Sequence, residues 1–165
     1  MATKDINNLE DLFMHQLESM YYAEKEIQKA MPKMAQKTTD SALRAAAEHH
    51  LKETGSQIQR LERVFKAMGK SPDMADCPTI EGLIEEAEEV MDSLSDKNLM
   101  DAALIAAIQA VEHHEITGYG TLIAWARQLG RQEVVELLEE TLQEEKAMDK
   151  KLTQMAESKI NRLAA

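Results

Sequence analysis

The chain has 165 residues, of which 44% are hydrophobic and 30% charged, and it contains only six Gly and three Pro. Aromatic residues make up 4% and β-branched residues are sparse, so sheets are disfavoured and we expect one all-α domain covering residues 1–165. The formal charge of −11 argues against nucleic acid and anionic membranes as partners, but it leaves metal cations open.

The start of the chain predicts residence in the cytoplasm. The stretch "MATKDINNLEDLF" lacks the basic and apolar regions of a signal peptide, and no apolar run reaches the length of about 18 residues that a membrane span needs. The single Cys77 has no second Cys for a disulfide and no Cys or His at a metal-site spacing, so we interpret it as incidental.

The first long helix is expected to begin after the capping residues Asn7 and Asn8. Its apolar residues recur at intervals of three and four from Phe13 to Met34, which is the pattern of a helix with one buried face. Glu24 interrupts this face. A carboxylate is therefore predicted inside the fold.

The second helix is expected over roughly 41–68, with its end near Gly69. Its middle is polar on the inner side too, where His50 and either Glu53 or Thr54 fall. Because the connection to the first helix is short, the two should run antiparallel.

The remaining elements are a short helix and a second long pair. The acidic stretch "IEGLIEEAEEVMDSL" predicts a short amphipathic helix, and a long helix should follow from about Ser95 or Asp96 to Gly130. Glu112 and Glu115 occupy its apolar face, together with Tyr119. Gly118 and Gly120 suggest close helix packing or a local bulge.

The last long helix is expected from about Arg131 to Met155 or beyond, with Glu145 in the middle of its apolar face. A shift of 91 residues lays the first helical pair on the last pair without a gap, and Glu24 then falls on Glu115 and Glu53 on Glu144. Two such hairpins joined by a long crossover predict an antiparallel four-helix bundle with the short helix inside the crossover.

Several carboxylates at one level of a bundle need neutralisation, because an uncompensated buried charge costs several kcal/mol. Facing Glu and His side chains can hold two divalent ions in such a core, and their oxygen and imidazole ligands suit iron or manganese. The candidate ligands are Glu24, His50, Glu53, Glu112, Glu115, Glu144 and Glu145, with the choice between the last two left open.

The two adjacent histidines of "VEHHEITGY" are expected to flank the site. If Glu112 and Glu115 point inward, His113 and His114 turn sideways or outward, where one can support a ligand carboxylate. Tyr119 is expected to be a packing residue.

Five blocks in order closely resemble the YciF branch of the YciE/YciF family of ferritin-like proteins: "AEKEI", "HLKETGSQIQRL", "EGLIEEAEEV", "DAALIAAIQAVEHHEITGYGTL" and "LLEETLQEEKAMDKKL". The resemblance implies a ferritin-like domain, a homodimer and a role in bacterial stress responses. It places the family's metal positions on the same candidate ligands. The wider ferritin-like superfamily has Glu-x-x-His on its second and last helices, but here Ser56 follows Glu53 at that spacing and Ala147 or Met148 follows Glu144 or Glu145.

The leading hypothesis is a stress protein with a carboxylate-bridged site for two ions that handles peroxide or oxygen. The alternative is a non-enzymatic helical dimer that binds or protects other molecules and whose polar core is closed by hydrogen bonds and ion pairs. Whether the protein is an enzyme stays open at this point.

Overall fold

The computed structural model describes residues 5–165, and this part of the chain is helical with no strand. The elements are α1 (Leu9–Lys37), α2 (Ser41–Ala67), α3 (Pro78–Ser93), α4 (Lys97–Gln128), α5 (Gln132–Met155), a π-helical turn (Ala156–Ile160) and the short α6 (Asn161–Ala164). The all-α class and the five predicted helices are confirmed.

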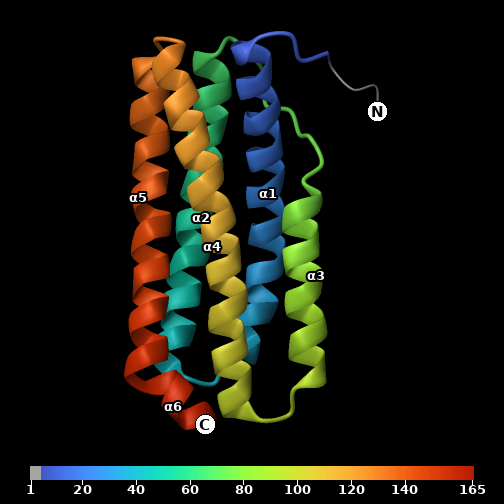
Figure 1. Ribbon diagram of the computed structural model, residues 1–165, viewed down its shortest axis with the longest axis vertical. Helices are drawn as coiled ribbons and strands as arrows, with labels where there is room; N and C mark the ends of the chain where they lie inside the picture. Colours follow the sequence, from blue (N-terminus) through green and yellow to red (C-terminus); the bar gives the residue numbers. More distant parts are fainter. Residues whose placement is uncertain (1–4) are drawn as a thin grey trace.

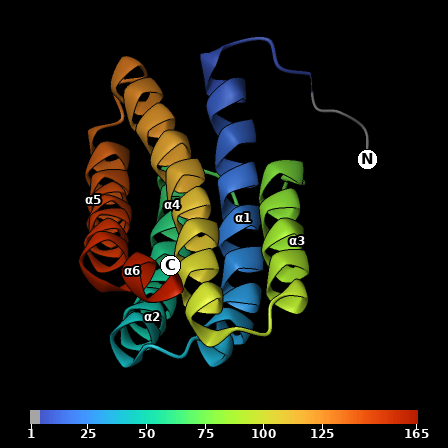
Figure 2. The same cartoon turned by 60° about the horizontal axis from the view of Figure 1, so that its bottom comes forward.

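Four of the helices form an antiparallel bundle. Figure 1 shows that α1 and α5 run in one direction while α2 and α4 run in the other. In sequence order α1 pairs with α2 and α4 pairs with α5, and further contacts of α1 with α4 and of α2 with α5 close the bundle. The crossover places α3 against α1 and α4 on the outside, as Figure 2 also shows.

Two glycines end the second helix of the chain and the long fourth helix as predicted. Gly69 has φ 71° and Gly130 has φ 68°, values in the left-handed region that residues with a Cβ rarely adopt. The backbone then folds back, since Lys70 N donates to Phe65 O and Arg131 N donates to Ala126 O, each over 2.9 Å. These hydrogen bonds satisfy carbonyls that the helix ends would otherwise leave open.

The internal repeat is visible in the helix ends. α1 ends at Lys37 and α4 ends at Gln128, 91 positions later, and α2 begins at Ser41 while α5 begins at Gln132, again 91 positions later. The two hairpins therefore have matching registers.

The core has two apolar clusters with a polar level between them. One cluster contains Ile27, Leu43 and Ile108, and the other contains Phe13 and Phe65 near the opposite end of the bundle. Eight buried polar residues lie on the helical turns between these two clusters: Glu24, His50, Thr54, Gln57, Glu112, Glu115, Thr141 and Glu145. Over residues 5–165, none of the helices combines the length and the hydropathy that a membrane span requires.

Candidate metal centre

Four buried side chains from three helices meet in the polar level. His50 lies on α2, Glu112 and Glu115 on α4, and Glu145 on α5, and each offers one ligand atom within 4.8 Å of the other three. Two of the carboxylates are three residues apart on α4, so one helical face presents both. Three oxygens and one imidazole nitrogen form a donor set that suits a divalent transition metal.

His50 is the only imidazole of this cluster and is 1% exposed. Its Nε2 atom lies 3.2 Å from Glu112 Oε1 and 3.8 Å from Glu145 Oε2. Neither ring nitrogen has a hydrogen-bond partner among the described residues. A buried nitrogen without a partner is costly, and metal coordination would satisfy it.

Glu24 on α1 faces the cluster from the opposite side of the bundle and is fully buried. The hydroxyl of Tyr119, one turn beyond Glu115 on α4, donates a hydrogen bond to Glu24 Oε1. Its other oxygen, Oε2, has no partner among the described residues. Glu24 thus has one oxygen fixed and one free to bind.

The carboxylates of this level hold their protons far above the ordinary range. Burial raises the pKa of Glu24 to about 8, with a further contribution from Glu145. The pKa values of Glu115 and Glu112 are also raised well above that of an exposed Glu. Burial is the largest cause of this rise, and neighbouring carboxylates add to it. The pKa of Glu145 is raised for the same first reason. Without a cation, these carboxyl groups therefore keep their protons to higher pH than exposed Glu side chains do.

The fit to metal rests on the unsatisfied atoms. Six carboxylate oxygens have no hydrogen-bond partner in the described part of the chain: Oε2 of Glu24, both oxygens of Glu112, both of Glu115 and Oε2 of Glu145. Native cores leave few such atoms, and a cluster of them points to an ion or to shared protons. The residues present fit one divalent ion at His50, Glu112, Glu115 and Glu145.

A second ion would find fewer ligands. The 91-residue shift relates His50 to Thr141 and Glu145 to Thr54, both buried threonines. Glu24 and Glu115 are related by the same shift, and both are buried carboxylates. Threonine hydroxyls thus stand where a symmetric site would repeat the imidazole of His50 and the carboxylate of Glu145.

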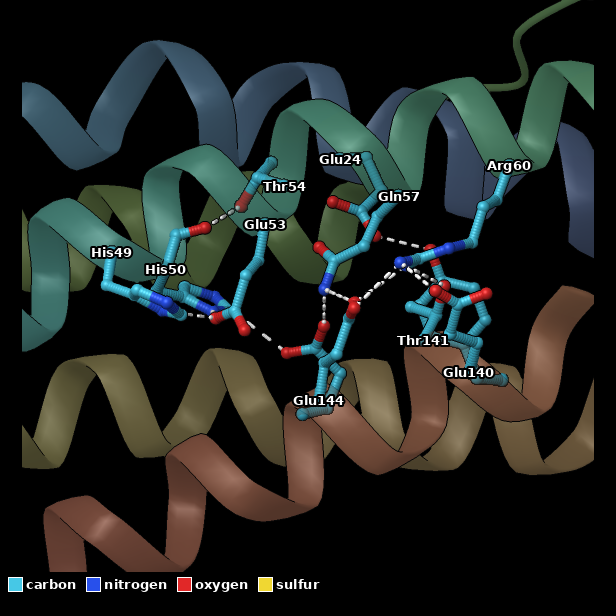
Figure 3. Close-up of polar contacts among 12 residues, drawn as sticks. Glu24, His49, His50, Glu53, Thr54, Gln57, Arg60, Glu140, Thr141 and Glu144 are labelled. Atoms are coloured by element: carbon cyan, nitrogen blue, oxygen red, sulfur yellow. Dashed lines mark hydrogen bonds and ion pairs between the residues drawn. The ribbon is translucent and has the colours of Figure 1, made fainter.

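Glu53 lies at the edge of the cluster, and the inner position of this turn is taken by Thr54. The Glu53 side chain is 26% exposed, and its Oε2 atom is 3.1 Å from His49 Nδ1 and 3.7 Å from His50 Nδ1. Figure 3 shows Glu53 beside both histidines. The nearby His50 and His49 lower the pKa of Glu53 against the opposing effect of burial. Burial alone would lower the pKa of His50, but Glu53, Glu145 and Glu24 outweigh it and raise that pKa.

Glu144 lies outside the cluster, at the seam between α2 and α5. Both of its oxygens accept from Arg60, over 2.7 Å each, and Gln57 Nε2 donates to Oε2 over 3.0 Å (Figure 3). The same Gln57 amide donates to Glu145 Oε1. Of the two residues that the sequence left as alternatives, the structure brings Glu145 into the core and pairs Glu144 with arginine.

The two histidines of α4 flank the site on opposite sides. His113 is exposed, with Nε2 3.2 Å from Asp149 Oδ1, whereas His114 Nε2 lies 3.5 Å from Cys77 Sγ. Burial alone would raise the pKa of Cys77. Hydrogen bonds with His114 and Ser19 outweigh this effect, and the pKa of the thiol is lowered to about 7. Cys77 therefore does have a histidine partner, which its sequence spacing could not indicate.

Three residues that contact the carboxylates were not assigned to the site from the sequence. Arg60 and Gln57 hold the α2–α5 seam, and Tyr119 was interpreted as packing although its hydroxyl binds Glu24. Gln57 and Tyr119 did fall on the inner helix faces, and polar groups at such positions were the available signal. Their partners are 88 and 95 residues away in sequence.

Together, the fold and its polar core define a ferritin-like helical bundle with a buried histidine and carboxylate cluster that can hold metal. The chain belongs to the family described as domain of unknown function DUF892, whose model matches residues 8–165. It is 44% identical over 161 residues to Protein YciF of Escherichia coli strain K12, with 97% of each chain covered.

Solved structures give the same result. The crystal structure of the E. coli stress protein YciF matches with a TM-score of 0.90 and 44% identity, over 94% of this chain and 99% of that one. The protein YcfI from Rhodopseudomonas palustris matches with a TM-score of 0.90 and 48% identity, over 93% and 98%. A protein from Xanthomonas campestris, at 23% identity and a TM-score of 0.75 over 95% and 96%, shares the fold alone. The resemblance found in the sequence blocks is confirmed.

Proposed function

We propose that the protein is a cytoplasmic stress protein whose bundle core binds divalent iron or manganese and uses it to react with peroxide or oxygen. The carrying observation is the convergence of His50, Glu112, Glu115 and Glu145 within 4.8 Å, all buried. The name of the E. coli relative, a stress protein, supports the physiological setting. The ligand types support iron or manganese over softer metals.

The residues divide the work of holding such ions. His50, Glu112, Glu115 and Glu145 would hold one ion, and Glu24 would offer an oxygen to a second, more weakly held ion. A bound redox metal would supply electrons to the oxidant. Tyr119 keeps Glu24 in place, and the apolar clusters above and below exclude water from the level.

Metal content tests the proposal directly. The protein is purified without chelator from cells grown with added iron and manganese, and metal per chain is measured for the wild type and for a Glu112→Gln, Glu115→Gln double variant. We expect about one tightly held ion per wild-type chain and strongly reduced content in the variant. A wild type without metal, which also gains none when titrated, would rule the proposal out.

The alternative function is that of a helical protein that binds or protects other molecules and has no functional metal. Hydrogen bonds within the polar level favour this alternative. Tyr119 with Glu24 and Gln57 with Glu145 already pair part of the level. The raised pKa values also allow the carboxyl groups to remain neutral without a cation. Metal stabilises only a native state that binds it, so an unchanged melting temperature at saturating Mn²⁺ would favour this alternative.

We also propose that the protein pairs with a second copy of itself through α4. The exposed positions between 98 and 124 of this helix hold no Asp, Glu, Lys or Arg: Asn98, Leu99, Ala106, Ala110, His113, Thr117 and Ala124. Two chains of charge −11 repel each other, and an uncharged face with small side chains allows the closest approach.

A further inference from the structure

A chain of ligand-type atoms connects solvent with the candidate metal centre along α2. His49 is 68% exposed, Glu53 is 26% exposed, and His50 is 1% exposed. Glu112 and Glu145, on the far side of the His50 ring, are fully buried. The exposed fraction of the side chain thus falls from His49 through Glu53 to His50, and each of these residues offers a nitrogen or an oxygen that can bind a cation.

One oxygen joins the outer and the inner part of this chain. Glu53 Oε2 lies 3.1 Å from His49 Nδ1 and 3.7 Å from His50 Nδ1, so it faces the exposed and the buried imidazole at once (Figure 3). His50 then presents its second nitrogen to Glu112 and Glu145, and the charges of Glu53 and Glu145 act on each other. The buried Nδ1 of His50 has no hydrogen-bond partner within residues 5–165, and it lies 3.7 Å from Glu53 Oε2.

As far as the structure describes the chain, the other side of His50 offers no comparable polar path. The small cavity that reaches His50 and Glu112 from α1, α3 and α4 is otherwise lined by apolar residues: Ile27, Ala30, Met31, Met34, Ile84, Ile108 and Val111. A hydrated divalent cation cannot shed its water against such a wall without a large free-energy cost. The polar approach lies on the side of α2 that carries Glu53.

We propose that His49 and Glu53 form an outer cation-binding station through which the divalent ion reaches the buried ligands. This inference rests on the proposed metal-binding function and assigns Glu53 a transient role, distinct from that of a resident ligand. Glu53 is suited to it because its partly exposed side chain can swing, whereas the buried His50 cannot. Replacing water molecules one at a time by Glu53 and His50 lowers the barrier to dehydration.

The test separates the rate of metal uptake from the affinity at equilibrium. Co²⁺ is mixed with the metal-free protein, and the visible absorbance of the bound ion is followed in time and then titrated to equilibrium. The variants are Glu53→Gln, His49→Gln and, as a matched control, Glu48→Gln, which removes the same charge from the exposed face of the same helix.

We expect Glu53→Gln to slow both uptake and release of Co²⁺ by about tenfold or more, while the dissociation constant changes less than about threefold. His49→Gln should slow uptake to a smaller extent, and Glu48→Gln should leave both rates within about twofold of the wild type.

Two outcomes would overturn the route while leaving the proposed function intact. Uptake by Glu53→Gln at the wild-type rate would show that the ion enters elsewhere. A large loss of affinity in this variant at an unchanged uptake rate would make Glu53 a resident ligand. A wild type that binds no Co²⁺ at all would instead contradict the metal-binding function and the route together.

Discussion

Tyr119 is the residue that anchors one carboxylate of the polar level, and its removal isolates that contact. Tyr119→Phe leaves the buried Glu24 Oε1 without its donor, which we expect to lower the free energy of unfolding by about 1–3 kcal/mol. Tyr21→Phe is the matched control, because Tyr21 donates to the partly exposed Glu62 over 2.9 Å and water can replace it there. Urea unfolding of both variants measures the difference, and equal losses would contradict the special role of the buried bond.

Glu144 and Glu145 are neighbours with opposite roles, so a pair of identical substitutions distinguishes them. Glu145→Gln removes a core oxygen next to His50 and should weaken Mn²⁺ binding at least about tenfold. Glu144→Gln removes the carboxylate that pairs with Arg60 and Gln57 outside the cluster, and it should leave the affinity within about threefold. Titration calorimetry on the metal-free proteins measures both, and the reverse order would place Glu144 among the ligands.

At the scale of a helix, Gly118 marks where α4 approaches α1. A Cβ built at Gly118 would overlap the sulfur of the buried Met20, whereas one built at Gly120 meets no atom within 4 Å. Close packing therefore explains the first glycine, and the helix continues through both without a bulge.

Replacing these two glycines by alanine should change the free energy of unfolding in opposite directions. Gly120→Ala should raise the free energy of unfolding by about 0.5–1 kcal/mol, since alanine favours the helix and the site has room. Gly118→Ala gains the same helix preference, but it must displace Met20 in a packed core, which costs about 1–3 kcal/mol and leaves a net loss. Thermal unfolding of both variants tests this, and two stabilised variants would show that Met20 repacks freely.

The elements were more predictable than the side-chain pairs of the site. Helix ends depend on local chemistry, such as the glycines at 69 and 130, and the apolar spacing of each helix is read within a few turns. The inner face is less certain at its edges, because neighbouring residues differ by about 100° around the axis. For this reason the sequence could not decide whether Glu53 or Thr54, and whether Glu144 or Glu145, faces the core. The packing of α2 on α5 decides it by setting how each helix is rotated about its axis.

At the scale of the whole molecule, the uncharged face of α4 predicts a dimer that a single charge can split. Ala110→Glu places like charges opposite each other across the proposed two-fold interface, so the dissociation constant should rise by at least about tenfold. Gln143→Glu adds the same charge to the exposed face of α5 and should leave the assembly unchanged. Sedimentation equilibrium measures the assembly, and a monomeric wild type at micromolar concentration would contradict the interface.

The buried carboxyls make stability depend on pH in an unusual direction. The pKa of Glu24 is about 8 in the folded protein, and an unfolded Glu titrates near its ordinary value of about 4.5. Between these pH values the unfolded chain has released a proton that the folded chain still holds, so raising the pH favours unfolding. Each such group contributes a slope of up to about 1.4 kcal/mol per pH unit, and the raised pKa values of Glu112, Glu115 and Glu145 act in the same sense.

We therefore expect the metal-free protein to lose stability steadily from about pH 5 to about pH 8, and the Glu24→Gln variant to show a shallower slope over this window. Urea unfolding in the presence of a chelator measures both slopes. Saturating Mn²⁺ should offset the loss most strongly at the upper end, because a bound cation replaces the protons that the ligands have released. A metal-free protein that gains stability toward pH 8, or a Glu24→Gln slope equal to that of the wild type, would show that these carboxyls are already ionised within the bundle.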